Sequence, residues 1–556
     1  MSSEKILGVL FDPARLVFRH EWYTKLLPDL ARWGFNTMVL NLADDRAGTI
    51  QLHRRPDLTS PHAFGQDKIR RLVRQAAKHG IQVIPLMPAF GHTGYIHRRP
   101  RYQHLGHGDG RRYLCPANPE TYEVMRDVME EVMELFPSPW FHVGLDEFGR
   151  IPDLNCPLCR KEFGAVPRWQ VYVRHVQWLR DLLAAHGRRM MMWNEFPRGP
   201  WKPAEVAEAL PKDIVLTIEN DRPEETRFHL DHGFDLIRSF PYLLSYPGTT
   251  ILPHAGNLDF QPWSVDTEAH ASRILGTISP VWENTYALFG TATYAIAHAA
   301  DQLRAPGGTP GFGRAFCEGY FGVADGTALA DILERQHRHA PVFRRLDFEN
   351  GTYTMTMMAG RLVNLFDDDT ANELTAADVA YGREFAEQAK AVGQGLRRER
   401  PAVTRNVRVL DAYILAADLA AHIGGRGDLM AGVTRDLREA DEAARAGEGS
   451  RAQRLRVGIW RALRRAAIES RRLLERAYRN FDWGYYPDHP AKHSFLPPAS
   501  GEGSPEMDQV WYFYGGNGSI LASLHYSTRY LEQLAREAEG LAAGKRTMPG
   551  LAARTG

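Results

Sequence analysis

The sequence predicts an α/β protein: a (β/α)8 TIM barrel followed by an all-α C-terminal domain. Eight short apolar runs, each followed by an amphipathic stretch, alternate along about the first 300 residues, as eight β-then-α units do in such a barrel. After the segment APGGTPG (305–311) the strand-like runs stop, and Ala, Leu, Arg and Glu recur at helical spacing. We therefore expect a barrel over residues 1–310 and a mainly helical domain over 311–556, with an aromatic loop segment near 481–505.

The expected strands are nearly continuous apolar runs, as in a parallel sheet that is covered on both faces. A doubly wound open sheet is the alternative, because the count of eight depends on two weaker runs, the sixth and the seventh. In chain order the eight runs are 6–11, 36–42, 81–87, 140–145, 189–193, 213–218, 234–240 and 274–282.

Helices are expected between these runs and throughout the second region, wherever apolar residues recur every three or four positions. The clearest of these stretches are 22–33, 68–79, 120–135, 169–186, 373–397, 406–422, 455–479 and 519–540.

Composition and charge exclude several classes of protein. Of the 556 residues 44% are apolar, so the chain can bury a large core and is not a disordered or fibrous protein. The 68 Lys and Arg balance the 67 Asp and Glu, so we expect no binding to nucleic acid or to a membrane. The opening MSSEKILGVLFDPAR does not resemble a signal peptide, and four cysteines are too few for a disulfide framework. These features predict a cytoplasmic protein.

Polar and aromatic residues follow every one of the eight expected strands. The carboxyl ends of the strands of a TIM barrel meet at one face, where active sites are built. Side chains that follow different strands should therefore lie together at that face. These side chains are Asp12, Arg15, Asp44, Asp45, His92, Asp146, Glu147, Asn194, Glu195, Glu219, Asn220, Asp221, Tyr242, Tyr246, Trp282, Glu283 and Asn284.

The sharpest local feature is the run HVGLDE (142–147) at the end of the fourth expected strand. Both carboxylates, Asp146 and Glu147, can reach the mouth of the barrel if the chain turns between them. Two carboxyl groups in different surroundings can divide the roles of acid and base. A solvated pair of loop charges is the alternative explanation for two adjacent acidic residues.

Several other segments accompany this run: GVLFDPAR (8–15), LLPDLARWGFNTMVLNLADD (26–45), PLMPAFGHTGY (85–95) and YLCPANPETY (113–122). Together with HVGLDE they resemble family 20 glycoside hydrolases, the β-N-acetylhexosaminidases, whose usual motif reads His-x-Gly-Gly-Asp-Glu. The segment 85–95 is most similar to the hexosaminidase D branch of that family. The resemblance spans about residues 6–300, which is the whole expected barrel.

The resemblance implies an exo-β-N-acetylhexosaminidase that removes terminal β-linked GlcNAc or GalNAc from a small-molecule or oligosaccharide substrate. In that family the 2-acetamido oxygen of the substrate attacks its own anomeric carbon, so the enzyme retains configuration without a nucleophile of its own. By the same resemblance Asp146 would orient the acetamido group, and Glu147 would serve as general acid and base. No cofactor or metal is implied.

The resemblance also assigns residues to a sugar pocket. Arg15 would hydrogen-bond sugar hydroxyls, with an ion pair to Asp12 or Asp45 as the alternative. Trp193 and Trp282 would form aromatic walls, or would belong to the rim of the barrel core. The further expected substrate contacts are His92, Tyr242 (with Tyr246 as its rival), Trp263 and Glu283.

Three positions depart from the family pattern. Pro88 stands where the family has an aspartate four residues before the histidine, so His92 needs another partner or contacts the substrate or the loop. Leu145 replaces the second glycine of the motif and could reshape the base of the pocket. Glu283 follows Trp282 directly, whereas the family has Trp-x-Glu, which leaves recognition of the sugar 4-position open.

The pair Cys156 and Cys159 lies just after the fourth strand. A single CxxC is a weak indication of zinc, which takes four ligands in structural sites. His142 or His175 could complete such a site. We expect reduced loop thiols and no metal.

Two alternative functions stay open from the sequence. An ordinary double-displacement glycosidase would use Glu147 as acid and Glu195 or Glu283 as nucleophile. A non-catalytic sugar-binding barrel is favoured by the aspartate that is missing at Pro88. The helical region is expected to pack against the barrel and to mediate a homodimer, because its length and apolar stripes exceed what a barrel cap needs. A cap within one chain, without a dimer, is the alternative.

Overall fold

The computed structural model describes residues 5–14, 18–44, 48–107, 113–147, 151–196, 202–219, 221–240, 262–281, 288–338, 376–484 and 520–545. The chain divides into two compact units. The first comprises Met1–Leu244, Asn257–Glu283 and Ala295–Pro310. The second comprises Ser245–Gly256, Asn284–Tyr294 and Gly311–Gly556.

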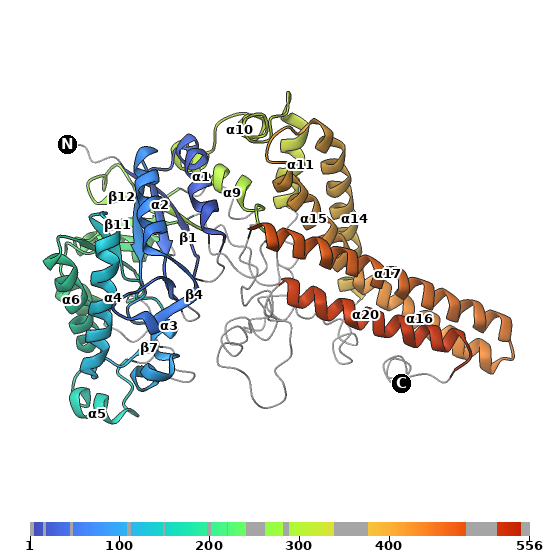
Figure 1. Ribbon diagram of the computed structural model, residues 1–556, viewed down its shortest axis with the longest axis horizontal. Coiled ribbons are helices and arrows are strands. Elements are labelled where there is room, and N and C mark those ends of the chain that lie inside the picture. The colour runs from blue at the N-terminus through green and yellow to red at the C-terminus, as the bar shows by residue number, and fades with distance from the viewer. Residues whose placement is uncertain are drawn as a thin grey trace. The chain divides into compact units, whose positions relative to one another are not determined.

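Eight parallel strands of the first unit close into a barrel (Figure 1). Around the barrel the strands follow the order β1-β12-β11-β10-β9-β8-β5-β2, and β1 pairs with β12 to close it. The predicted TIM barrel is therefore confirmed, and the open sheet is excluded. The strands are β1 (Ile6–Phe11), β2 (Thr37–Asn41), β5 (Gln82–Leu86), β8 (Trp140–His142), β9 (Arg189–Trp193), β10 (Val215–Ile218), β11 (Asp235–Ser239) and β12 (Ile274–Val281).

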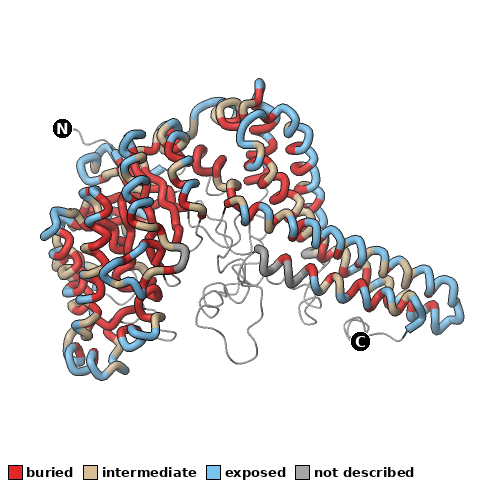
Figure 2. Tube along the Cα trace, viewed as in Figure 1, coloured by how far each residue is buried: buried red, intermediate tan, exposed pale blue. Residues whose placement is uncertain are grey.

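Apolar side chains fill the interior of the barrel. Because helices cover the outer face of each strand, both faces are buried, and Figure 2 shows the strands as buried elements. At Gly276, φ is 150° and a Cβ would lie 2.1 Å from the carbonyl oxygen of Ile6, so β12 can pass β1 there only without a side chain. One interior cluster consists of Ile6, Leu10, Val39, Ile84, Leu86, Met191, Trp193, Val215, Ile237 and Ile278.

The helices of this unit begin and end at recognisable residues. In α4 (Pro119–Leu135), the side chain of Asn118 accepts a hydrogen bond from the Glu120 N–H at 3.0 Å, and Pro119 occupies the first turn. Pro137 follows shortly after the helix and cannot continue it. The other helices are α1 (His20–Trp33), α2 (Gln66–Lys78), α3 (Gly94–His97), α5 (Pro157–Phe163), α6 (Arg168–Ala185), α7 (Pro203–Ala209), α8 (Pro223–Asp231) and α9 (Thr293–Arg304).

Two small sheets lie outside the barrel, in the connections that follow β2 and β5. The first pairs β3 (Gly48–Ile50) with β4 (Thr59–Phe64), and the second is an antiparallel hairpin of β6 (Gly106–His107) and β7 (Tyr113–Leu114). The sequence did not predict them, because β3, β6 and β7 are too short to show a period and β4 (TSPHAF) is not an apolar run. The hairpin bears on the site because Tyr113 also bridges to Gly91, in the loop after β5.

The described part of the second unit is helical. The helices α16 (Arg426–Arg445), α17 (Gly449–Gly484) and α20 (Ile520–Ala542) bury their apolar faces in one common cluster. Inside it, Ser470 Oγ and Thr528 Oγ1 form a buried hydrogen bond of 2.8 Å. The other helices of this unit are α10 (Phe312–Phe316), a π-helical turn (Cys317–Phe321), α11 (Thr327–Arg338), α14 (Ala376–Glu399) and α15 (Val407–Gly424).

Helix α17 extends four residues into the segment that the sequence predicts as an aromatic loop. Phe481 is buried on the apolar face of the helix, and the Trp483 ring lies 4.8 Å from the Phe289 ring in an edge-on contact. The apolar stripe therefore continues to the end of the helix and sustains it. Residues 485–505 lie outside the described residues.

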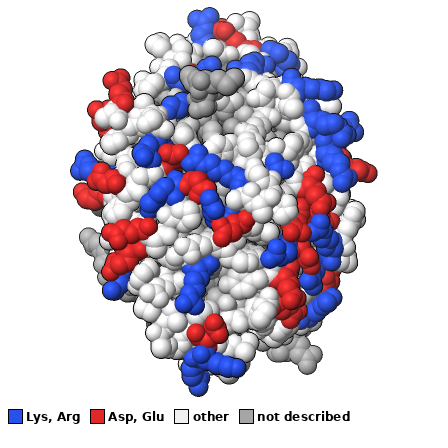
Figure 3. Space-filling model, turned by 90° about the vertical axis from the view of Figure 1, so that its left-hand side faces the viewer, with Lys and Arg blue, Asp and Glu red and all other residues white. Residues whose placement is uncertain are grey.

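Charged side chains of both signs are interspersed over the face shown in Figure 3, as the net charge of +1 leads one to expect. On the surface of the first unit, Arg54 pairs with Glu130 at 2.7 Å and Arg180 pairs with Asp213 at 2.7 Å. None of the described helices combines the length and the apolar character that a membrane crossing requires.

Several histidines of the first unit are buried, among them His142, His175 and His229. Burial lowers the pKa of His142, His175 and His229 to about 3, so all three are neutral near pH 7. The His229 ring packs edge-on against Phe196 and Phe234. Charging any of these imidazoles in place would put a cation into an apolar interior.

Lowering the pH should therefore destabilise this unit. In the unfolded chain each imidazole titrates near its ordinary pKa of about 6.5, so below that pH the unfolded chain binds more protons than the folded chain. The free energy of unfolding should fall as the pH drops from about 6.5 toward about 3, by at most about 1.4 kcal/mol per pH unit for each histidine. His229→Leu should make this slope shallower in urea unfolding between about pH 6.5 and 5. An unchanged slope in the variant would contradict the assignment.

Candidate active site

The chain turns sharply just beyond β8 and carries both carboxylates of the HVGLDE run with it. The φ angles are 69° at Gly144, 70° at Leu145 and 46° at Glu147, all in the left-handed region. That region strains a residue with a side chain by about 1–2 kcal/mol. Leu145 therefore keeps the backbone conformation that suits the glycine of the family motif, and its side chain is fully buried. The replacement of this glycine by leucine therefore leaves the turn that presents Asp146 and Glu147 in place.

His92 places an imidazole between the two carboxylates. Its Nε2 lies 3.3 Å from Asp146 Oδ2 and 3.4 Å from Glu147 Oε2. The side chain of His92 is 8% exposed and that of Asp146 is 21% exposed, whereas that of Glu147 is 72% exposed. The structure thus brings together three residues that the sequence singled out. Glu147 is the one that is most accessible to a substrate.

Close approach of two backbone segments seats His92 in this position. The N–H of Ala89 donates to the carbonyl of Val143 at 3.0 Å, so parallel pairing continues beyond the ends of β5 and β8. At Gly91 a Cβ would lie 1.9 Å from the carbonyl oxygen of Asp146. Because no side chain fits there, glycine is required immediately before His92.

Buried residues hydrogen-bond to the backbone of this turn. His142 Nδ1 accepts the N–H of Gly144 at 3.0 Å, so its Nε2 carries the proton and donates to Thr217 Oγ1 at 3.1 Å. The Trp193 ring lies 4.8 Å from the His142 ring, and the Trp193 N–H donates to the Gly144 carbonyl at 2.9 Å. Trp193 is 3% exposed and belongs to the interior cluster of the barrel. Its contact with a sugar stays a prediction.

Pro88, which stands where the family has an aspartate, hydrogen-bonds within its loop through its carbonyl group. Its carbonyl accepts a hydrogen bond from the hydroxyl of Tyr95 at 3.2 Å, and the Tyr95 N–H donates to the Asp44 carbonyl at 3.0 Å.

A buried hydrogen bond also joins the ends of β1 and β2. Asn41 Nδ2, at the end of β2, donates to Asp12 Oδ1, just after β1, at 2.8 Å. Sequence analysis did not single out Asn41, because it ends an apolar strand and only its pairing reveals it.

A polar cluster at the ends of β10 and β11 joins Asp221 and Trp263, which the sequence analysis named, to Arg238, which it did not. Arg238 is buried, its Nη1 lies 3.4 Å from Asp221 Oδ2, and burial lowers its pKa against the opposing effect of Asp221. Asp221 also accepts the N–H of Ser264 at 2.9 Å. The Trp263 ring lies 5.2 Å from the guanidinium carbon of Arg238. Trp263, expected as a further wall of the sugar pocket, thus packs on a buried ion pair.

Some of the predicted residues lie outside the described residues, and their parts in the site stay predictions. The undescribed residues among those expected at this face are Arg15, Asp45, Asn220, Tyr242, Tyr246, Trp282, Glu283 and Asn284. Glu195, a nucleophile in the double-displacement alternative, is described and lies half-buried after β9. Burial raises the pKa of Tyr172, and the charge of Glu195 raises it further, so this carboxylate acts on the α6 side chain.

The two cysteines of the CxxC pair have other neighbours than the sequence suggested. His142 pairs with Thr217, and His175 Nε2 lies 3.2 Å from the Ala89 carbonyl, so neither histidine joins the pair. Instead His107 and Cys115 lie beside Cys156 and Cys159, and the ligand atoms of all four are within 4.8 Å of one another.

Comparison with known proteins gives a family match for the barrel. A family model described as "Glycosyl hydrolase family 20, catalytic domain" matches residues 7–286, about half of the chain. The "Beta-hexosaminidase" of Vibrio furnissii is 29% identical over 251 residues, which are 38% of this chain and 39% of that protein. "Hexosaminidase D" of Bos taurus is 32% identical over 94 residues, which are 16% of this chain and 27% of that protein.

Among solved structures, the chitobiase of Flavobacterium johnsoniae is similar, with a TM-score of 0.48 and 18% identity over 75% of this chain and 70% of that one. The chain spans about two fifths of the length of the Vibrio furnissii relative. The family model covers the barrel from β1 past the end of β12. The chain therefore belongs to glycosyl hydrolase family 20.

Proposed function

We propose that this chain is an exo-β-N-acetylhexosaminidase that removes terminal β-linked GlcNAc or GalNAc by substrate-assisted, retaining hydrolysis. The observation that carries the proposal is the imidazole of His92 between Asp146 and Glu147, at the carboxyl end of the barrel. Membership of family 20 and the names of the Vibrio furnissii and Bos taurus relatives support the same substrate class. Residues 1–310 are then the catalytic domain.

In the first half of the reaction, the acetamido carbonyl oxygen of the bound sugar attacks the anomeric carbon while the glycosidic bond breaks. Glu147, the accessible carboxyl group, donates its proton to the leaving oxygen. The ionised Asp146 accepts a hydrogen bond from the acetamido N–H and stabilises the positive charge that develops on the oxazolinium ring.

In the second half, Glu147 is a carboxylate and takes a proton from a water molecule. The water oxygen attacks the anomeric carbon, and the bond from that carbon to the acetamido oxygen breaks. The acetamido group is restored, the sugar keeps its original configuration, and Glu147 is protonated for the next cycle. No covalent bond to the protein forms.

His92 acts as a positioning residue for both carboxylates. One Nε2–H can donate to one acceptor at a time, so the imidazole holds Asp146 and Glu147 within reach of a single proton. His92 is itself buried, and the preceding Gly91 packs against the Asp146 carbonyl, so the backbone that carries the imidazole is closely packed. This contact offers an orienting role for His92 that does not need the aspartate missing at Pro88.

The double-displacement alternative needs a second carboxylate, from Glu195 or Glu283, across the sugar from Glu147. Two adjacent carboxylates that share His92 favour substrate assistance instead, since one can orient the acetamido group while the other transfers the proton. The sugar-binding alternative rests on the missing aspartate alone. We therefore rank both below the substrate-assisted reaction.

We further propose a cytoplasmic location and a homodimer. The location is supported by the four cysteines, none of which forms a disulfide, as is usual in a reducing compartment. The dimer is supported by Ile468, a large apolar side chain that α17 exposes to 44%. The other apolar side chains on the facing sides of the described helices α16, α17 and α20 pack against one another within the unit.

Glu147→Gln should remove the proton donor and leave ground-state sugar binding nearly intact. With a poor leaving group, kcat should fall by about 10²–10⁴-fold, the usual contribution of general acid–base catalysis. The loss should shrink for an aryl glycoside with a very good leaving group, which needs little protonation. Steady-state kinetics with both kinds of substrate measure this difference. Near-native rates of the variant on the poor leaving group would place the acid elsewhere.

Asp146→Asn keeps the shape of the side chain but removes the charge that faces the oxazolinium ion. We expect kcat and kcat/KM to fall together by about 10²–10³-fold, because the lost interaction forms only as charge develops. Glu195→Gln is the matched control and should retain the native rate. Loss of melting temperature without loss of rate in Asp146→Asn would reduce Asp146 to a loop cap, and inactivity of Glu195→Gln would favour double displacement.

The homodimer predicts that the full chain sediments at micromolar concentration with twice the mass of one chain. Ile468→Glu should return it to the monomer without changing the melting temperature, because the side chain lies on the surface of α17. A wild-type monomer at that concentration would dispose of the dimer.

A further inference from the structure

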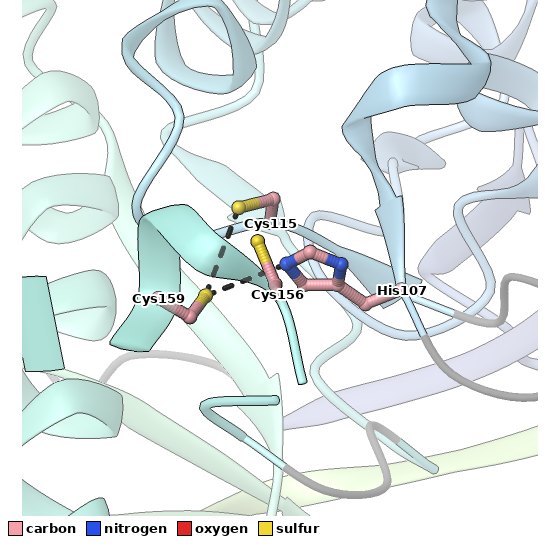
Figure 4. Close-up of side chains that lie close together, drawn as sticks. All are labelled: His107, Cys115, Cys156 and Cys159. Atoms are coloured by element: carbon pink, nitrogen blue, oxygen red, sulfur yellow. Dashed lines mark hydrogen bonds between the residues drawn. The ribbon is translucent and has the colours of Figure 1, made fainter. Parts of the chain in front are cut away.

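Three cysteines and one histidine of the first unit converge beside the active-site loops. His107 ends β6, Cys115 follows β7, Cys156 precedes α5, and Cys159 lies on α5. Figure 4 shows that their side chains point toward one another from the hairpin and from the helix. Their ligand atoms all lie within 4.8 Å of one another. The mechanism proposed above uses none of the four.

We propose that His107, Cys115, Cys156 and Cys159 bind one Zn²⁺ ion in a closed structural site. The ion would join the β6–β7 hairpin, which belongs to the connection after β5, to the segment that follows the Asp146–Glu147 turn. This inference does not depend on the activity proposed for the barrel.

The spacing of the ligand atoms fits tetrahedral zinc. Bonds of about 2.3 Å to sulfur and about 2.05 Å to nitrogen place two sulfurs about 3.8 Å apart, and a sulfur and a nitrogen about 3.5 Å apart. The Sγ atoms of Cys115 and Cys159 are 3.7 Å apart, and Cys159 Sγ lies 3.4 Å from His107 Nε2 (Figure 4). Both separations match the edges of such a tetrahedron.

The type of donor also points to zinc. Thiolate and imidazole ligands suit Zn²⁺, whereas Mg²⁺ and Ca²⁺ take oxygen ligands. Four protein ligands fill a tetrahedron and leave no place for water or substrate, so the site would be structural and not catalytic. Cys115 and Cys159 are fully buried and His107 is nearly so, which suits a permanent ion more than an exchanging one.

Disulfide chemistry explains the cluster less well. A disulfide requires two sulfurs about 2.05 Å apart, and the Cys115 and Cys159 sulfurs lie 3.7 Å apart. A redox pair of Cys156 and Cys159 would need neither Cys115 nor the ring nitrogen that His107 turns toward Cys159. A metal uses all four side chains at once.

The position of the site indicates the structural role that the ion would have. The Leu114 N–H, next to Cys115, donates to the Phe90 carbonyl at 3.3 Å, and Tyr113 bridges to Gly91. The hairpin that holds His107 and Cys115 is therefore paired with the residues immediately before His92. On the other side, Cys156 and Cys159 follow Glu147 in sequence. Zinc would tie together the two loops whose contact forms the proposed catalytic constellation.

The first test is the metal content of the intact chain, purified without chelators or metal-affinity resin. Elemental analysis should find about one zinc ion per chain, and Co²⁺ exchanged into the site should give the visible absorption of a tetrahedral cobalt–thiolate centre. Mass spectrometry should find four free thiols after the metal is removed. Absence of zinc from protein expressed with added zinc, or a disulfide among Cys115, Cys156 and Cys159, would overturn the proposal.

Matched variants assign the ligands. Cys115→Ser and Cys156→Ser should each reduce the zinc content at least about tenfold after dialysis against a weak chelator. Cys317→Ser is the control, since Cys317 is buried in the helical unit and lies outside the cluster, and it should keep the full zinc content. If a ligand variant fails to fold, Co²⁺ titration of chelator-treated wild type decides instead. Full zinc content in Cys115→Ser or Cys156→Ser, or no cobalt–thiolate absorption, would refute the site.

Discussion

The arrangement of the site depends on one close contact between two backbone segments, Gly91 against the carbonyl of Asp146. A Cβ at Gly91 would lie 1.9 Å from that oxygen, so the loops after β5 and β8 can meet only because this residue has no side chain. The contact brings His92 against Asp146 and Glu147. The parallel pairing of Ala89 with Val143 holds the two loops at this distance. The geometry of the candidate site thus follows from backbone packing at the rim of the barrel.

Strain in the same loops is consistent with a functional site. His92, Leu145 and Glu147 all have positive φ, at 51°, 70° and 46°, and such strain persists only where the surroundings enforce it. The enforcing contacts are buried: His142 binds the Gly144 N–H and Thr217, and the Trp193 N–H binds the Gly144 carbonyl. A zinc ion bound by the β6–β7 hairpin and by the segment at α5 would restrain the same two loops at a second place. We expect a strained turn of this kind to need more than one such restraint.

The barrel was predictable from the sequence because its strands are buried on both faces and appear as apolar runs. Even the weak runs at 213–218 and 234–240 form strands, β10 and β11, since closure of the sheet requires them. The motif HVGLDE made Asp146 and Glu147 candidates because adjacent acids at a strand end are chemically conspicuous. His92 became a candidate through its family segment, and the structure adds its contact with both carboxylates.

What the sequence did not reveal depends on residues far apart in the chain. The role of Gly91 arises from a carbonyl more than fifty positions later, and no local pattern encodes it. The CxxC motif suggested loop thiols, because His107 and Cys115 join it only through the short β6–β7 hairpin. Arg238 interrupts an apolar strand, and its pairing with Asp221 and Trp263 appears only in three dimensions.

The central claim, that the substrate supplies its own nucleophile, is tested most directly by two aryl β-glycosides with the same leaving group. One carries a 2-acetamido group and the other a 2-hydroxyl group. The account predicts that kcat/KM for the 2-hydroxyl substrate is lower by at least about 10³-fold, because it lacks the well-placed internal nucleophile. Comparable values of kcat/KM, or a sugar trapped covalently on Glu195 or Glu283, would contradict the claim.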